Sequence, residues 1–455
     1  MSPAEALMWR LERDPALSST FASVTVLESA IDFDTFCRRI ERATYLVPRL
    51  RHRVQDVPAN LAPPAWVDDP DFAIERHVTR ATIAPPGDTR ALLDLATEVA
   101  ATPFDRRHPL WEFIVIDDLA DGRGAIIQKQ HHTIADGEAS VKLSRLFVDF
   151  ERDAPEPPPL TAEELADAVT PKPAQSTPAD QVRGLVEEGF RRSRAAFGQA
   201  SEMLRDPTHL PKMATAAVST VRSLAKQLTD VEKARSPVWT ARSLNRRFET
   251  LRAPLDPVRR VAKSLGGTLN TAFLTGATAA AGAYHRQVGT PVDELRASMA
   301  ISTRTKDSGA NAFTLARFLV PTGEMDMAKR FQAVREVTEA LRSSSGGASL
   351  NSMAQMAAML PTAIVGTLAR QQTQAVDFAT SNVRAAHFPL YIGGARIIAT
   401  HPLGPLGGVA FNLTLLSYDG SLDMGVNIDT DAVAEPELLR ICLEESFAEL
   451  VALDQ

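Results

Sequence analysis

The sequence is poor in cysteine: its 455 residues include only 2, Cys37 and Cys442. So sparse a set favours two free thiols in a reducing compartment over a disulfide framework. An excess of basic charge is also missing, because 49 Lys and Arg face 56 Asp and Glu, for a net charge of −7. A nucleic-acid partner would need a strong basic field, so the charge balance argues against that class of function.

Long apolar runs are missing as well. Charges interrupt the N-terminal MSPAEALMWRLERDP too early for a signal peptide, and the least polar stretch, TAFLTGATAAAGAY, is too short and too rich in alanine to cross a membrane. We therefore expect a cytoplasmic protein, with attachment to a membrane surface left open. The 44% hydrophobic and 23% charged composition is typical of a soluble globular chain.

The length of 455 residues is too great for one ordinary core and predicts two lobes. The first lobe, 1–153, has the pattern of a mixed α/β unit, because β-branched runs alternate with apolar residues at helical spacing. We predict strands at 21–29, 110–119 and 125–130, a helix over 32–47, and a helix over 140–150 whose apolar face comprises Val141, Leu143, Leu146, Phe147 and Phe150.

A proline-rich connector begins at residue 154 and leads into two helical tracts, 182–204 and 213–228, with basic residues opposite their apolar stripes. Two interpretations of this linker, 154–235, stay open. We favour helices that pack on the lobes, which is the ordinary meaning of an amphipathic stripe. The alternative is peripheral attachment to an anionic membrane or a lipid droplet.

The second lobe, 236–455, mixes sheet and helix in similar proportion to the first, so we expect a pseudo-symmetric pair. It opens with a strand, a helix, a Gly-Gly turn and a long alanine-rich helix. A turn at Asp419–Gly420 predicts a hairpin, and the final helix covers 435–453. Further strands are predicted at 294–303, 317–322, 408–420 and 421–429.

One short loop carries a chemical pattern. QHHTIADGEAS, residues 130–140, follows a predicted strand and precedes a helix. Neighbouring residues at a strand end point to opposite sides, so only one of His131 and His132 can face a site, where its imidazole would act as a general base. Asp136 can fix the loop through backbone hydrogens or an arginine, and Gly137 allows the close turn into the helix.

Three interpretations of this loop compete. A metal site is the weakest, because the histidines lack helical i, i+4 spacing and no Cys or His cluster stands nearby, so we expect no metal and no cofactor. A capped polar turn and a general base at the mouth of a cleft are nearly equal on the loop alone. No Gly-x-Ser-x-Gly elbow occurs and neither cysteine has a reactive context, so a base would act on the substrate's own hydroxyl or thiol.

HHTIADG resembles HHxxxDG, the active-site motif of the acyltransferase superfamily related to chloramphenicol acetyltransferase. With its flanks, the sequence resembles the bacterial wax ester synthase/diacylglycerol acyltransferase family over almost the whole chain outside 155–235. The matching residues beyond the loop are Pro109, Leu110 and Trp111 (the family's PLW element), Asn270 (its Asn-Asp element), and Ser381 and Asn382 (its Ser-Asn-Val motif).

This resemblance implies an α/β fold of two chloramphenicol-acetyltransferase-like lobes with a tunnel between them. It also implies an O-acyltransferase that uses acyl-CoA and a lipid alcohol to form triacylglycerol or wax esters. His132 would be the general base, His131 a support for the strand end, and Asp136 an orienting residue that we pair with Arg304. A tetrahedral oxyanion needs a donor, for which Asn270 is the candidate.

The sequence departs from the family's pattern at two places. Thr271 stands where the family has aspartate, and Arg384-Ala385-Ala386-His387 replaces the prolines that follow Ser-Asn-Val. Two alternatives follow from these departures and from the basic linker. The protein would be a catalytically silent lipid-binding or membrane-scaffold relative, or it would acylate a different lipid alcohol or take its acyl group from a carrier-protein thioester.

Overall fold

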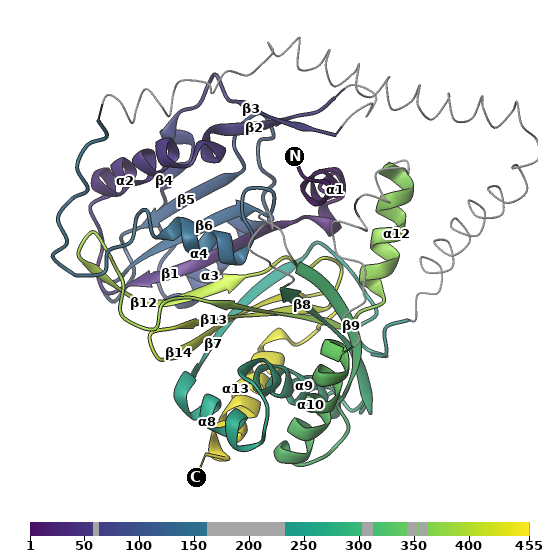
Figure 1. Ribbon diagram of the computed structural model, residues 1–455. Coiled ribbons are helices and arrows are strands. Elements are labelled where there is room, and N and C mark those ends of the chain that lie inside the picture. The colour runs from purple at the N-terminus through teal and green to yellow at the C-terminus, as the bar shows by residue number, and fades with distance from the viewer. Residues whose placement is uncertain (58–62, 162–232, 303–312, 344–353, 355–361, 455) are drawn as a thin grey trace, which may run out of the picture.

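The computed structural model describes residues 1–57, 63–161, 233–302, 313–343, 354 and 362–454. Within these residues the chain forms two mixed α/β lobes, each built on a six-stranded sheet with helices packed against it (Figure 1). The predicted two-lobe α/β architecture is therefore confirmed. The helical tracts predicted at 182–204 and 213–228 lie outside the described residues.

The first sheet consists, in spatial order, of β11 (Tyr391–Ile392), β12 (Ala395–Leu403), β1 (Thr20–Leu27), β6 (Gly124–His131), β5 (Trp111–Ile116) and β4 (Val78–Arg80). Neighbouring strands are antiparallel except β4 and β5. Apolar side chains of helix α2 (Phe33–Leu46) cover one face, and those of helix α3 (Thr89–Ala101) cover the other. The sheet is therefore buried on both sides.

The second sheet consists of β7 (Arg246–Pro254), β14 (Ser421–Asp429), β13 (Phe411–Tyr418), β10 (Phe378–Arg384), β8 (Glu294–Ser302) and β9 (Phe313–Pro321). Helix α9 (Leu269–Gln287) is buried along most of its length, because its alanine and glycine residues let neighbouring elements approach closely. A Cβ on Gly276, for example, would lie 2.8 Å from the Phe447 ring. The helices of this lobe pack into one apolar core with the sheet: α8 (Leu255–Ser264), α9 (Leu269–Gln287), α10 (Met327–Ser343) and α13 (Pro436–Ala452).

The predicted hairpin is confirmed, since β13 and β14 pair antiparallel from Phe411↔Ile428 to Tyr418↔Ser421. Its two turn residues both have positive φ, 42° at Asp419 and 78° at Gly420. This is the two-residue turn whose twist matches that of the flanking strands, and Asp-Gly suits it. Both cysteines lie in helices and are free thiols, as we expected.

The helix predicted over 140–150 is shorter and begins earlier, as α4 (Gly137–Ser144). After Ser144 the backbone makes tight turns, and Asp149 pairs with Tyr391 through two hydrogen bonds, so the chain cannot continue as a helix. The predicted apolar face is consequently wrong at its end: Phe147 is buried, but Phe150 is 53% exposed.

Strands β11 and β12 come from the C-terminal half of the sequence but complete the first sheet, where β12 pairs with β1 from Ala22↔Leu403 to Leu27↔Ile397. Strand β12 also packs on β13 and β14 of the second sheet. It therefore joins the two lobes, as Figure 1 shows between β1 and β13. The boundaries 1–153, 154–235 and 236–455 describe chain order and stay a prediction.

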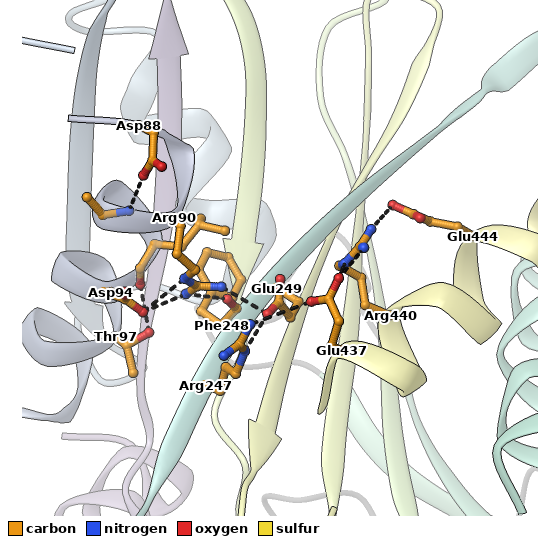
Figure 2. A network of polar contacts seen from close by, with 12 residues as sticks. Asp88, Arg90, Asp94, Thr97, Arg247, Phe248, Glu249, Glu437, Arg440 and Glu444 are labelled. Carbon is orange, nitrogen blue, oxygen red and sulfur yellow. Dashed lines mark hydrogen bonds and ion pairs between the residues drawn. The ribbon is translucent and has the colours of Figure 1, made fainter. Parts of the chain in front are cut away.

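A polar network ties the lobes together on another side (Figure 2). Arg90 of α3 donates to Glu249 Oε1 (2.9 Å) and to the carbonyl of Phe248 (3.0 Å), both on β7. Arg247 bonds the same Glu249 oxygen at 2.5 Å and lies 3.5 Å from Glu437 of α13. Because Glu249 is buried, these arginines compensate a carboxylate that would otherwise be costly.

Among the described residues, no helix combines the length and apolarity needed to cross a membrane. The remaining elements are α1 (Pro3–Leu11), η1 (Pro15–Leu17), η2 (Pro48–Arg51), β2 (His52–Gln55), β3 (Ala65–Asp68), η4 (Ile74–Arg76) and α12 (Thr362–Gln374), of which β2 and β3 form a separate two-stranded sheet.

Candidate active site

The two adjacent histidines lie at the end of β6 and face in different directions. His131 is the last residue of the strand and His132 begins the turn that follows. The His132 ring lies against Phe21 of β1, with ring centroids 4.6 Å apart, and its backbone N–H donates to the carbonyl of Ser19 (3.1 Å). His131 bonds Glu12 instead. The two side chains therefore point to different sides, as the alternation of side chains along a strand predicts.

His132 is half-buried, and this environment disfavours its charged form. Burial, and to a smaller extent His131, lower the pKa of His132 to about 4, against the opposing effect of Glu12. At neutral pH the imidazole is therefore unprotonated and has a lone pair with which it can accept a proton. The sequence interpretation, in which the imidazole titrates close to neutral pH, needs this correction.

His131 is completely buried and held at both ring nitrogens. The Thr133 backbone N–H donates to its Nδ1 (3.1 Å), so Nδ1 carries no hydrogen and Nε2–H is left to donate to Glu12 Oε2 (3.0 Å). Burial works to raise the pKa of Glu12, but hydrogen bonds from His131, Ser18 and Ser19 hold it at about 2. His131 is thus a fixed support against an ionised carboxylate.

Asp136 is the N-cap of helix α4, and its side chain accepts from the backbone N–H of Ala139 (2.8 Å). It is buried, so this bond also compensates the carboxylate. Gly137 is the first residue of the helix. The partner that we predicted for Asp136, Arg304, lies outside the described residues, so that pairing stays a prediction.

Side chains join the two ends of the loop 130–140. Ser140 Oγ of α4 donates to Gln130 Oε1 of β6 (2.9 Å), and Gln130 is buried. This bond pins the first turn of α4 against the strand and closes the loop that carries His132. Helix α4 also packs against β10, which carries Ser381 and Asn382.

The Asn-Thr and Ser-Asn-Val elements meet in space. Asn382 Nδ2 on β10 donates to Asn270 Oδ1 in the first turn of α9. Both residues are half-buried, and Asn382 Oδ1 has no hydrogen-bond partner among the residues that the structure describes. Ser381 is the preceding residue of β10, opposite Thr414 of β13.

Thr271, which departs from the family pattern, completes a capping box with Thr268. Each side chain accepts from the other's backbone N–H at 3.3 Å. A short polar side chain at this position satisfies the free N–H groups at a helix start in the way an aspartate would. The substitution therefore preserves the local structure that holds Asn270.

The PLW element braces the strand end from behind. The carbonyl of Leu110 accepts from the His131 backbone N–H (3.0 Å). Trp111 is fully buried, donates through Nε1 to the carbonyl of Leu50 (2.8 Å) and stacks on His77 with centroids 4.4 Å apart. Pro109 and Leu110 directly precede β5, which begins at Trp111. These residues fix the position of β6 and do not point to chemistry of their own.

Two of the pockets in the described part of the chain are lined by residues near the PLW element or just before β1. One of about 590 Å³ adjoins the PLW element and is lined by His77, His108 and Glu112 among others. The second, of about 250 Å³, lies where residues 14–17 meet 242–246 and α12. Neither lining includes His132, so the tunnel between the lobes stays a prediction. No three His, Cys, Asp or Glu side chains of the described residues are grouped to hold a metal ion.

Glu12 is a site residue that the sequence did not suggest. It lies 119 residues before His131 and caps the C-terminal end of α1, in a segment without any catalytic motif. Only the pairing of β1 with β6, which places Thr20 opposite His131, brings the two together. No local pattern in the sequence signals that contact.

Two family models match the sequence: the wax ester synthase/diacylglycerol acyltransferase catalytic domain over residues 1–273, and the WS/DGAT C-terminal domain over residues 309–451. One similar protein, from Mycobacterium tuberculosis, carries the name of a diacylglycerol O-acyltransferase that was assigned without direct proof of activity. It is 29% identical, and the alignment covers 100% of this chain and 92% of the relative. The tgs1 protein of M. tuberculosis, named in the same way, is 28% identical over 97% of this chain and 93% of its own.

Solved structures share the fold. The wax ester synthase/diacylglycerol acyltransferase from Marinobacter aquaeolei VT8 is similar with a TM-score of 0.67 at 19% identity, over 100% of this chain and 99% of that chain. The starter condensation domain of rhizomide synthetase, in complex with C8-CoA, has a TM-score of 0.57 at 15% identity, over 100% and 94%. At these identities the likeness concerns the two-lobed architecture.

Proposed function

This chain belongs to the wax ester synthase/diacylglycerol acyltransferase family, and we propose that it is an acyl-CoA-dependent O-acyltransferase forming a neutral lipid ester, triacylglycerol or a wax ester. One observation carries the proposal. His132, in the motif position of the general base, lies half-buried against Phe21 at a strand end that is fixed from several sides, and burial lowers its pKa to about 4. The C8-CoA bound by a condensation domain of the same fold supports an acyl-CoA donor.

The reaction needs one base and no covalent enzyme intermediate. The unprotonated nitrogen of His132 takes the proton from the acceptor hydroxyl while that oxygen attacks the thioester carbonyl of acyl-CoA. The tetrahedral intermediate collapses by breaking the carbon–sulfur bond. The imidazolium of His132 returns its proton to the departing thiolate, so the products are the ester and free CoA, and the base is regenerated.

Asn270 is our candidate for stabilising the oxyanion. In its contact with Asn382 it uses Oδ1 as the acceptor, which leaves the hydrogens of its own Nδ2 for another oxygen. Its place in the first turn of α9 adds the favourable field of a helix N-terminus. The roles of Asp136 and Gln130 are to hold the loop in position.

The test is acyl transfer by the purified full-length chain, with radiolabelled palmitoyl-CoA and either dioleoylglycerol or hexadecanol, followed by lipid chromatography. We expect ester formation with at least one acceptor, and a fall of about 10²–10⁴-fold in kcat for His132→Ala, as loss of a general base predicts. A matched control is His387→Ala, at an exposed position, for which we expect wild-type activity. Undiminished ester formation by His132→Ala would refute the mechanism.

The alternatives give different results in the same assay. A catalytically silent lipid-binding relative would bind lipid without turnover across donors and acceptors. A carrier-protein-dependent enzyme would be active with an acyl-carrier thioester and inactive with acyl-CoA.

We also propose a test of the alternative interpretation of the linker, in which the enzyme works at a lipid surface, because its expected acceptors are water-insoluble. The basic tracts at 182–204 and 213–228 motivate this. Flotation with anionic liposomes tests it, by comparing wild type with a variant in which Arg191, Arg192 and Arg194 are replaced by glutamate. Equal flotation of both proteins would exclude a role for these three arginines in membrane binding.

A further inference from the structure

Glu12 collects hydrogen bonds from two parts of the chain that flank the catalytic loop. As the C-cap residue of α1 it accepts from Ser18 Oγ (2.6 Å), the Ser19 backbone N–H (2.8 Å) and Thr20 Oγ1 (3.4 Å), all just before or at the start of β1. Its fourth donor is His131 Nε2, at 3.0 Å. One carboxylate therefore joins the beginning of β1 to the end of β6.

These contacts fix the backbone on both sides of His132. Ser19, held by Glu12 through its N–H, uses its carbonyl to accept from the His132 N–H (3.1 Å). On the other side, His131 Nδ1 accepts from the Thr133 N–H (3.1 Å), and Arg49 reaches the Thr133 carbonyl at 3.4 Å. A displacement of the Glu12 carboxylate would thus also move His131, Ser19 and Thr133, which lie before, opposite and after His132.

The carboxylate is also the negative charge that opposes the desolvation of His132. Its side chain is only 17% exposed, so solvent screens it weakly. The charged or titratable groups that face it are His131 and Lys129 of β6 and Arg106 of the loop before β5. The ammonium of Lys129 is already paired with Glu112 at 3.3 Å, while His131 donates directly to Glu12.

We propose that Glu12 is a positioning residue for the catalytic base: through His131 its carboxylate fixes the backbone around His132, and its charge stabilises the imidazolium that forms during proton transfer. This rests on the proposed function of His132. The role requires an anion at this place, and not merely a side chain of suitable size. Glutamine and aspartate separate the two requirements, because glutamine keeps the size and aspartate keeps the charge.

The test compares Glu12→Gln, Glu12→Asp and Glu28→Gln in the acyl-transfer assay. Glu28 is a matched control, since its carboxylate is also held ionised, at the other end of β1, by Arg152. For Glu12→Gln we expect kcat to fall roughly tenfold with little change in KM, the size of one charge-assisted hydrogen bond. Glu12→Asp should recover part of the rate, and Glu28→Gln should match the wild type.

A purely structural role predicts the reverse order, with Glu12→Gln at least as active as Glu12→Asp, and that result would overturn the proposal. A second measurement does not depend on a variant that folds or on turnover: ¹⁵N NMR of histidine-labelled wild type should show His131 as the Nε2–H tautomer. An Nδ1–H tautomer contradicts the proposal whatever the activities. If His132→Ala kept full activity, the proposed function would fail, and the tautomer would still decide whether Glu12 holds His131.

Discussion

The end of the first sheet that carries His132 and the centre of the second sheet bury polar side chains in different patterns. On β6 the three consecutive residues Lys129, Gln130 and His131 are almost completely buried. On β13, buried apolar residues such as Leu413 and Leu415 alternate with the buried polar residues Asn412 and Thr414. Buried polar groups cost free energy unless they are hydrogen-bonded, so both sheets carry this cost, and the first sheet carries it at the residues that lead into His132.

Hydrogen bonds offset this cost in the first sheet. Gln130 accepts from Ser140, His131 donates to Glu12 and Lys129 pairs with Glu112. The first two of these bonds also fix segments next to His132. The first lobe thus uses buried, hydrogen-bonded groups to hold the segment around His132 in place, while the second lobe is chiefly a scaffold that presents its asparagine pair.

The largest effect on stability should come from the second lobe. Leu413→Ala removes a fully buried side chain from the centre of β13, and we expect it to lower the free energy of unfolding by about 2–5 kcal/mol. The kcat of the folded fraction should not change. Denaturant unfolding together with an activity assay checks both, and a loss of kcat without a loss of stability would contradict the division between the lobes.

The next effect concerns the one place where the second lobe should take part in chemistry. Asn270→Ala should lower kcat roughly 10²-fold if its amide stabilises the oxyanion. The melting temperature should change little, because Asn270 is only half-buried. Asn245→Ala, at an exposed position of the same lobe, is the control. Similar kinetics for both variants would limit Asn270 to a structural contact with Asn382.

The smallest effect is expected where the sequence departs from the family. Thr271→Asp restores the family's Asn-Asp pair but replaces one capping side chain by another. Thr271 is buried, so the new carboxylate needs the Thr268 N–H as its donor, and we expect the free energy of unfolding to fall by about 1 kcal/mol while kcat stays the same. Calorimetry and the acyl-transfer assay measure these. A large gain in kcat would show that the aspartate has a chemical role that Thr271 cannot fill.

Local patterns in the sequence predicted much of the fold. The hairpin at Asp419–Gly420 and the helix over 32–47 follow from turn chemistry and apolar spacing, which are properties of neighbouring residues. The opposite directions of His131 and His132 follow from strand geometry alone. The family resemblance added the PLW and Ser-Asn-Val elements, whose contacts with β6 and α9 no local pattern would have indicated.

What the sequence did not predict depends on contacts between distant segments. Glu12 reaches His131 only because β1 pairs with β6, and β12 completes the first sheet only because it pairs with β1. The early end of α4 has the same origin, since Asp149 leaves the helix to pair with Tyr391. The helical spacing of apolar residues continues to Phe150, because this spacing contains no information about a distant residue that competes for the same backbone.

The low pKa of His132 makes stability depend on pH. Its pKa in the folded protein, about 4, lies below the unperturbed value of 6.5, so as the pH falls from about 6.5 towards 4 the unfolded chain binds a proton that the folded chain does not. Stability should therefore decrease over this range. Since burial lowers the pKa of His77, His285 and His401 in the same direction, His132→Gln should remove only part of the decrease, as denaturant unfolding at several pH values would show.

The claim that His132 is an unprotonated base is tested most directly by its own titration. In ¹⁵N NMR of histidine-labelled protein, assigned by the loss of one signal in His132→Gln, we expect His132 to be neutral at pH 7 and to take up a proton only near pH 4. Titration near pH 6.5, or a ring already protonated at pH 7, would contradict the account of the site.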